Sequence, residues 1–233
     1  MKHSPLAAGL AIGLLSAASA LAQTAPATQD LKAGSKHIRI TYENLTTGQG
    51  FSPPAFMSHN GSAPPLFKEG EKAAFGLMRL AEEGNPAPLL DDAGKMMGKA
   101  IGMAATGLPT PPGKKSHTIE IEVTRDHPMV SGAWMLGMTN DGFTGISAVN
   151  AYEMREPKTM ELMAYDAGTE KNNEKKGSLI AMMGTDRDPE GGVVAMHKGI
   201  RGDADAPAEW KFDPAKPVAR ITITPVATKT ASQ

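Results

Sequence analysis

Alternating apolar and polar residues mark three segments of the chain as strands. Apolar side chains occupy every second position in residues 38–42, 119–123 and 219–223. Such alternation is typical of antiparallel strands with one buried face. Two less regular apolar stretches, 133–138 and 159–165, are expected to be central strands, and the segments between are rich in Gly, Pro, Asn and Asp. The pattern predicts an all-β protein folded as an antiparallel β-sandwich.

One region, at about residues 71–104, departs from this alternation and predicts a helical insertion. Between residues 71 and 83 apolar residues follow the i, i+3, i+4, i+7 spacing of an amphipathic helix, which Gly84 is expected to end. Helical spacing recurs from Leu89 to Met103, which predicts a second helix. Prolines 109, 111 and 112 then close the insertion before the next strand.

The two ends of the chain are expected to lie outside the folded domain. Residues 1–22 combine a short positive start, an apolar stretch of small residues and a small-x-small cleavage pattern, which predict a secretory signal peptide. Residues 23–35 and 226–233 are small and polar without periodicity, so we expect a disordered lead-in and tail. This leaves one domain at 36–225 and no membrane span after signal cleavage, in a protein secreted to the periplasm or beyond.

Composition and motifs exclude several classes of function. The 233 residues contain no Cys, which removes thiol nucleophiles, iron–sulfur clusters, Cys-ligated zinc and disulfides. Lys plus Arg number 24 against 25 Asp plus Glu, a balance that argues against nucleic acid as a partner. The chain also lacks the G-x-S-x-G, H-E-x-x-H, P-loop and dinucleotide-binding motifs. We therefore expect no enzyme, and predict no catalytic or cofactor-binding residue.

Two acidic loops offer the ligands of a hard cation. Residues 139–145 (TNDGFTG) and 165–174 (YDAGTEKNNE) each follow an expected strand. Ca²⁺ takes six to eight oxygen ligands, which carboxylates, Asn amides and the carbonyls of turning loops supply together. Gly168 has the backbone freedom to let Asp166 and Glu170 converge. The alternative is that these Asp and Asn residues only cap turns.

Two further segments resemble functional motifs but do not match them. Residues 186–191 (DRDPEG) begin like an EF-hand loop, but position twelve is His197 instead of Glu and the flanks are not helical. Residues 201–203 (RGD) match an adhesion tripeptide, which three common residues form by chance in Gly-rich loops.

At the acidic loops the sequence resembles the spondin domain, the N-terminal module of the F-spondin and mindin family, which also occurs as stand-alone secreted bacterial proteins. The resemblance runs from about residue 38 to residue 223. It rests on five ordered blocks, which are 43–46 (ENLT) with 51–54 (FSPP) and His59, 140–145 (NDGFTG), 165–174, 191–199 and 217–221 (PVARI).

The resemblance implies a β-sandwich similar to calcium-dependent membrane-binding modules, with one Ca²⁺ held by loop carboxylates. The animal domains have Asp where this chain has Glu170, a Trp where it has Tyr165, and cysteines, so the chain looks like the bacterial branch. In that branch His59 and His197 could join Glu170 or Glu174 around a softer metal, or each His could bond to a loop carbonyl. The candidate metal ligands are Asp141, Asp166, Glu170, Asn140, Glu174, His59 and His197.

The expected function is non-catalytic calcium binding in adhesion or in binding an unknown extracellular or cell-surface ligand. The 15 methionines suggest an alternative, a periplasmic copper-binding protein, because thioethers are good Cu(I) ligands. The candidate copper ligands are three pairs, Met135 with Met138, Met160 with Met163, and Met182 with Met183. Against copper, Met78, Met96 and Met97 fall on apolar faces of the expected helices, as flexible core residues do. A metal-dependent hydrolase is a third alternative, supported only by the acidic loops.

Overall fold

A computed structural model describes residues 34–202 and 204–226. The predicted signal peptide, the lead-in up to residue 33 and the tail from residue 227 lie outside the described residues. Among those described, no helix is long and apolar enough to cross a membrane.

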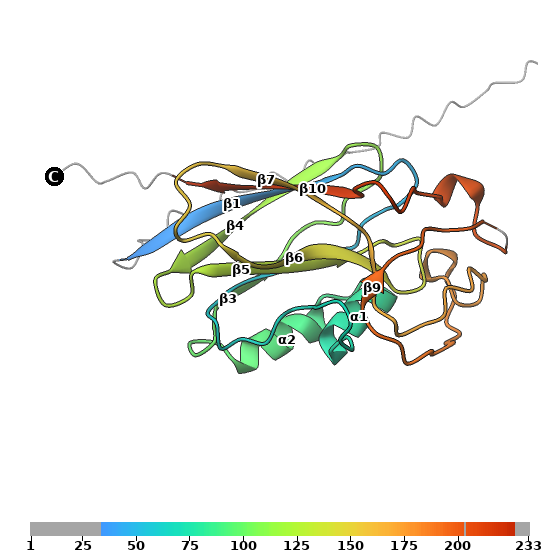
Figure 1. Ribbon diagram of the computed structural model, residues 1–233, viewed down its shortest axis with the longest axis horizontal. Helices are drawn as coiled ribbons and strands as arrows, with labels where there is room; N and C mark the ends of the chain where they lie inside the picture. The colour runs from blue at the N-terminus through green and yellow to red at the C-terminus, as the bar shows by residue number, and fades with distance from the viewer. Residues whose placement is uncertain (1–33, 203, 227–233) are drawn as a thin grey trace, which may run out of the picture. The chain divides into compact units, whose positions relative to one another are not determined.

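Two antiparallel sheets lie face to face and confirm the predicted β-sandwich (Figure 1). The first sheet has the strand order β4-β1-β10-β7. Its members are β1 (Ser35–Asn44), β4 (Ser116–Thr124), β7 (Lys158–Leu162) and β10 (Ala219–Pro225). The alternation that predicted β1, β4 and β10 places one side-chain row of each strand in the core; Ile40, Ile121 and Ile221 are fully buried.

The second sheet has six strands in the order β3-β2-β5-β6-β8-β9. They are β2 (Ala55–His59), β3 (Ile101–Thr106), β5 (Met129–Met135), β6 (Gly142–Asn150), β8 (Tyr165–Asp166) and β9 (Ala195–Met196). The stretch at 159–165, expected to be one strand, is divided: β7 belongs to the first sheet and β8 to the second. The chain therefore crosses between the sheets at Met163 and Ala164.

The space between the sheets is filled around one aromatic side chain, Trp134. Its ring centroid lies 5.8 Å from those of Tyr42 and Phe56 and 6.1 Å from that of Phe51, all tilted. Aromatic pairs at such distances and angles are favourable beyond the area they bury. This core anchors both sheets and leaves the loops at their ends free to carry chemistry.

Helices α1 (Phe75–Glu83) and α2 (Ala87–Lys95) cover the outer face of the six-stranded sheet (Figure 1). Leu77 and Leu80 of α1 pack there against Phe143 of β6 in a second apolar cluster. As predicted, α1 ends at Gly84, whose φ of 64° is the left-handed conformation that glycine adopts without strain.

The second predicted helix, from Leu89 to Met103, is wrong in its C-terminal part. Helix α2 ends at Lys95, a turn follows, and residues 101–106 form strand β3, which pairs with β2. In the turn, Gly98 adopts a φ of 75°, which is not a helical conformation. Ile101 is buried as the first residue of β3 and not as part of a helix. Strand pairing overrides the helical spacing of the sequence here.

A long loop region follows β8 and continues to β10. Within it lie η1 (Ile180–Met182), β9 and η2 (Ala208–Trp210), and a small apolar cluster of Leu179, Ile200 and Ala206. Figure 1 shows these segments in orange and red beside one end of the six-stranded sheet. The β5–β6 turn, with the first acidic loop, contacts this region through Asp141.

Candidate site in the acidic loops

Asp141 is the most buried carboxylate of the two acidic loops. It lies in the turn between β5 and β6 and is 0 % exposed. Its Oδ2 atom accepts the backbone N–H groups of Thr169 at 2.7 Å and Glu170 at 3.0 Å, and the Thr169 hydroxyl at 3.1 Å. Its Oδ1 atom is buried and has no hydrogen-bond partner. Asp141 therefore ties the two loops together while one oxygen remains available.

The electrostatic environment of Asp141 disfavours its charge. Burial, and next to it the negative charge of Asp166, raise the pKa of Asp141 to about 7, although the hydrogen bonds from Glu170 and Thr169 oppose the shift. Neither Asp141 nor Asp166 forms an ion pair within the described part of the chain. The two carboxylates thus repel each other with no cationic side chain to compensate.

Asp166 lies in β8, which pairs with β6 so that Asp166 faces Gly142 across the ladder. Its Oδ1 accepts the backbone N–H of Gly168 at 2.7 Å, and its Oδ2 accepts the side-chain amide of Asn172. Gly168 has a φ of 69°, and a Cβ there would lie 2.5 Å from the backbone of Val193. The loop after Asp166 therefore needs glycine at this position.

Glu170 is tied to Asp141 through its backbone N–H, while its side chain contacts Arg187. Its Oε1 lies 3.1 Å from a guanidinium nitrogen of Arg187, while its buried Oε2 has no partner. Burial raises the pKa of Glu170, and Arg187 opposes that shift. Arg187 also lies 2.6 Å from Glu83 and 3.6 Å from Glu82 of α1. Arg187 cannot be predicted from the sequence because its partners are distant in sequence.

Asn140 and Glu174 play a different part, since they hold backbone together. Asn140 Oδ1 accepts the backbone N–H of Glu174 at 3.3 Å. The carboxylate of Glu174 accepts the backbone N–H groups of Arg201 and Gly202, each at 2.7 Å. Both residues thus connect the loops through hydrogen bonds, as turn-capping residues do.

His197 is buried against the same loops, but the polarity of its ring does not suit a metal. Its Nδ1 accepts the backbone N–H of Gly199 at 2.9 Å, so in the neutral ring Nε2 carries the proton. A ligating His does the reverse and donates its second ring N–H to a neighbour. Burial lowers the pKa of His197, although the charges of Asp166 and Glu174 oppose this. Nε2 is buried without a partner.

His59 is not brought to the acidic loops. It ends β2 opposite Met129, whereas the β5–β6 turn lies beyond Met135 at the other end of β5. Its ring nitrogens lie 3.0 Å from the carbonyl of Asn60 and 2.8 Å from the hydroxyl of Ser131. Of the seven predicted ligands, six lie in the acidic loops or against them, and His59 lies apart from them.

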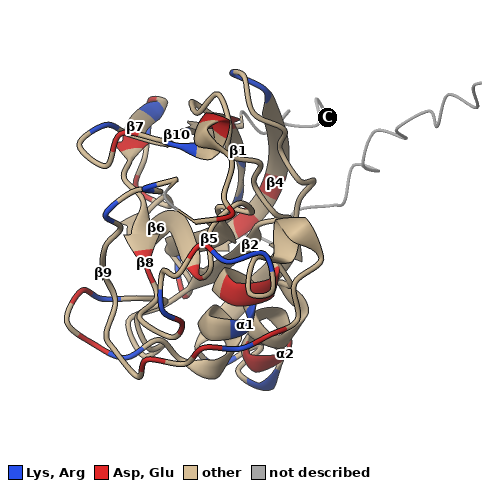
Figure 2. Ribbon diagram, turned by 90° about the vertical axis from the view of Figure 1, so that its right-hand side faces the viewer, with Lys and Arg blue, Asp and Glu red and all other residues tan. Residues whose placement is uncertain are grey.

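These residues do not form a finished metal centre. Among residues 34–202 and 204–226, no group of three or more His, Asp or Glu side chains is arranged to hold a metal ion. Lys and Arg lie among Asp and Glu along these loops, so no single sign of charge dominates the region (Figure 2).

A family comparison decides what kind of domain this is. The model of the spondin N-terminal domain (Spondin_N) matches residues 41–178, more than half of the chain. The chain belongs to the spondin N-terminal domain family. A comparison with curated proteins finds no match.

Spondin domains are extracellular and generally non-catalytic, and membership supports an extracellular binding module. The matched residues include the blocks with Asn44, Asp141 and Asp166, whereas the expected blocks at 191–199 and 217–221 lie outside them. Strand β10 nevertheless pairs with β1 in the same sheet, so the domain continues beyond the match.

The packing of the described residues supports neither the copper-binding alternative nor the hydrolase alternative. Met135 is buried, Met160 packs against the core between the sheets, and Met183 is 90 % exposed.

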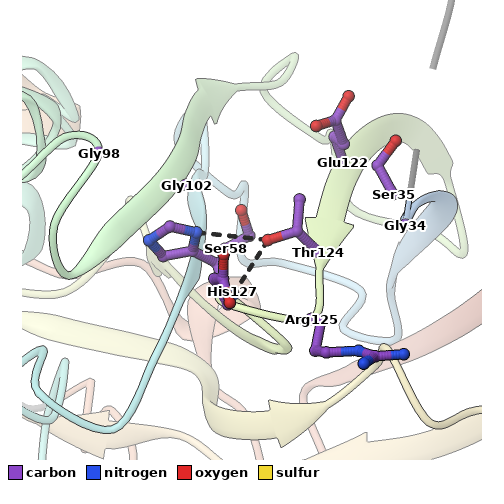
Figure 3. Close-up of a pocket in the computed structure, with 10 residues that line it drawn as sticks. Gly34, Ser35, Ser58, Gly98, Gly102, Glu122, Thr124, Arg125 and His127 are labelled. Carbon is purple, nitrogen blue, oxygen red and sulfur yellow. Dashed lines mark hydrogen bonds between the residues drawn. The ribbon is translucent and has the colours of Figure 1, made fainter. Parts of the chain in front are cut away.

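A hollow of about 630 Å³ lies between β3 and β4, lined among others by Glu122, Arg125 and His127 (Figure 3). None of the predicted site residues lines it.

Proposed function

We propose that this spondin domain is a secreted module, in the periplasm or outside the cell, that binds one Ca²⁺ at its acidic loops and serves in adhesion or in binding an extracellular ligand. The observation that carries the calcium proposal is the unpartnered, fully buried Oδ1 of Asp141 beside the carboxylate of Asp166. Buried charges are normally paired or bound to metal, and here no cationic side chain pairs with either group among the described residues.

The donor set fits a hard cation in kind. Asp141 and Asp166 supply carboxylate oxygens, and Glu170 has a second oxygen without a partner. Ca²⁺ accepts such oxygens together with backbone carbonyls and water, in flexible geometry. A bound Ca²⁺ would neutralise the repulsion between Asp141 and Asp166. Because Glu170 is paired with Arg187, we expect it to bind only if that ion pair opens.

The test is calcium titration by calorimetry, combined with melting in excess Ca²⁺ and in chelator. Free Ca²⁺ at 100 times its Kd should stabilise the fold by about 2.7 kcal/mol. Asp166→Ala should abolish both the heat of binding and the shift. Asp141→Asn should also abolish them while making the calcium-free protein more stable, because it removes a buried, unpaired charge.

The matched control is Asp91→Asn, which removes an exposed carboxylate on α2. It should leave calcium binding unchanged. Equal melting in Ca²⁺ and in chelator, with no heat of binding, would overturn the calcium proposal. Calcium binding that survives Asp141→Asn and Asp166→Ala would move the site elsewhere.

A further inference from the structure

A small apolar pocket lies between the six-stranded sheet and the two helices, away from the acidic loops. Its volume is about 110 Å³. Apolar side chains from β2, α2, β3 and the loop before α1 line it, among them Met57, Leu66, Leu89, Met96 and Ile101. At Gly76 of α1, a Cβ would lie 2.8 Å from the Cα of Leu89, so the helices that cover the pocket touch closely.

Two buried polar side chains, His59 and Ser131, also line this pocket. They are 4 % and 2 % exposed, and His59 Nε2 lies 2.8 Å from the Ser131 hydroxyl. The carbonyl of Asn60 can only accept, so His59 Nδ1 carries the proton and donates to it. Nε2 is then an acceptor, and the Ser131 hydroxyl donates its hydrogen to it.

The position of Ser131 is fixed by an irregularity in the sheet. The pairing of β5 with β6 shifts register between Val130 and Gly132, and the backbone N–H of Ala148 donates to Ser131 Oγ at 2.8 Å. Ala148 has a φ of 54°, which is costly for a residue with a Cβ. Backbone strain of this kind persists where the surrounding contacts hold it, and it often accompanies a functional site.

The hydrogen bonds of Ser131 leave one lone pair of its hydroxyl oxygen without a donor. A hydroxyl has one donor hydrogen and two acceptor lone pairs. The hydrogen is given to His59, and one lone pair receives the N–H of Ala148. The pocket therefore presents an apolar wall and one remaining acceptor, which a hydroxyl of a ligand could satisfy.

The size of the pocket limits the ligand to about one ring. An apolar cavity of about 150 Å³ in another protein binds benzene. This pocket is somewhat smaller, and its lining includes Asp92, whose carboxylate pairs with Lys95 on the same helix. We propose that the pocket is a second binding site of the domain, which takes a small apolar molecule carrying one hydroxyl group, donated to Ser131 Oγ.

The probe is phenol, with benzene as its partner lacking the hydroxyl. In amide NMR spectra of the protein, phenol should shift the signals of residues around Ser131 and Ala148 in a saturable way. Benzene should bind about tenfold more weakly, because one buried hydrogen bond is lost. Chelator should change neither result, since no residue of the acidic loops lines the pocket. Failure of the calcium proposal is therefore distinguishable from failure of this one.

Two variants and one control variant test the assignment. Ala93→Leu fills the pocket from α2 and should abolish phenol binding, while Ala87→Leu adds the same side chain at an exposed position of that helix and should not. Ser131→Ala should remove the preference for phenol over benzene. It can also destabilise the bulge, which is why the filling variant is needed.

Absence of saturable shifts at about 10 mM phenol in the folded protein would overturn the proposal. So would unchanged binding in Ala93→Leu, which would place phenol elsewhere on the surface. Equal binding of phenol and benzene in the unaltered chain would overturn the role given to Ser131.

Discussion

Two regions of this domain bury polar side chains, and they differ in how many of those side chains find partners. At the end of β1, the Asn44 side chain donates to the carbonyls of Gln49 and Thr110, and its Oδ1 accepts the backbone N–H and the hydroxyl of Thr46. In this region only the Thr110 hydroxyl, among the buried side-chain groups that the structure describes, lacks a partner. In the acidic loops, Asp141, Glu170 and His197 each keep one buried atom without a partner.

The difference separates a structural motif from a candidate binding site. A buried polar group that is fully hydrogen-bonded stabilises the local fold, whereas an unpaired one costs free energy. The side chain of Gln49 is also satisfied, by the carbonyl of Trp210 and the N–H of Met138. The family block around Asn44 thus positions loops, and the block around Asp141 is where we propose that an ion binds.

We call the hydrogen-bonded cluster around Asn44 the closed region and the acidic loops the open region. The strongest test of the closed region is Asn44→Ala. It removes four hydrogen bonds at a fully buried position and leaves their partners unsatisfied, so the free energy of unfolding should fall by about 3 kcal/mol. Urea unfolding measures this change. Asn150→Ala, at an exposed position that accepts a single backbone hydrogen bond, is the control and should cost under about 1 kcal/mol. A similar, small loss in both variants would show that the Asn44 network is not a structural anchor.

In the open region, Arg187→Gln should lower the stability of the calcium-free protein but raise its affinity for calcium. Without calcium, the loss of the cation leaves Glu170 buried and unpaired, which should lower stability by roughly 1–3 kcal/mol. With calcium, Glu170 is free to join the ion, so we expect tighter binding, by about tenfold. Calorimetry and melting measure the two effects.

The control for that variant is Arg79→Gln, because Arg79 also pairs with Glu83 but not with Glu170. It should leave the calcium affinity unchanged. An affinity that stays the same in Arg187→Gln would mean that Glu170 takes no part in binding the ion.

The fold can be predicted from the sequence where apolar and polar residues alternate clearly, but not where tertiary packing decides between helix and strand. Strands β1, β4 and β10 alternate cleanly and were predicted. For β3 the sequence predicts the end of a helix, because Met96, Ala100 and Ile101 also fit helical spacing, and only pairing with β2 distinguishes the two.

The candidate site was predictable in the same limited sense. The sequence placed Asp141 and Asp166 in neighbouring loops, and the structure brings those loops together through backbone hydrogen bonds to Asp141. The partner of Glu170 depends on the path of a loop with no periodic signal, so Arg187 could not be assigned. His59 was grouped with the acidic loops only by the resemblance, and sheet register places it at the other end of β2.

The smallest expected effect concerns Tyr42, in the same closed region as Asn44. Burial raises the pKa of Tyr42 to about 12, and its hydroxyl donates to the carbonyl of Leu108 at 2.9 Å. The unfolded chain loses this proton near pH 10, so the stability that Tyr42 contributes is present below pH 10 and is lost as pH rises toward about 12. Between pH 9 and pH 11 the free energy of unfolding should therefore fall by about 1 kcal/mol more in the unaltered chain than in Tyr42→Phe. Urea unfolding at the two pH values measures the difference, and parallel losses in both proteins would show that the Tyr42 hydroxyl ionises in the folded state as readily as in water.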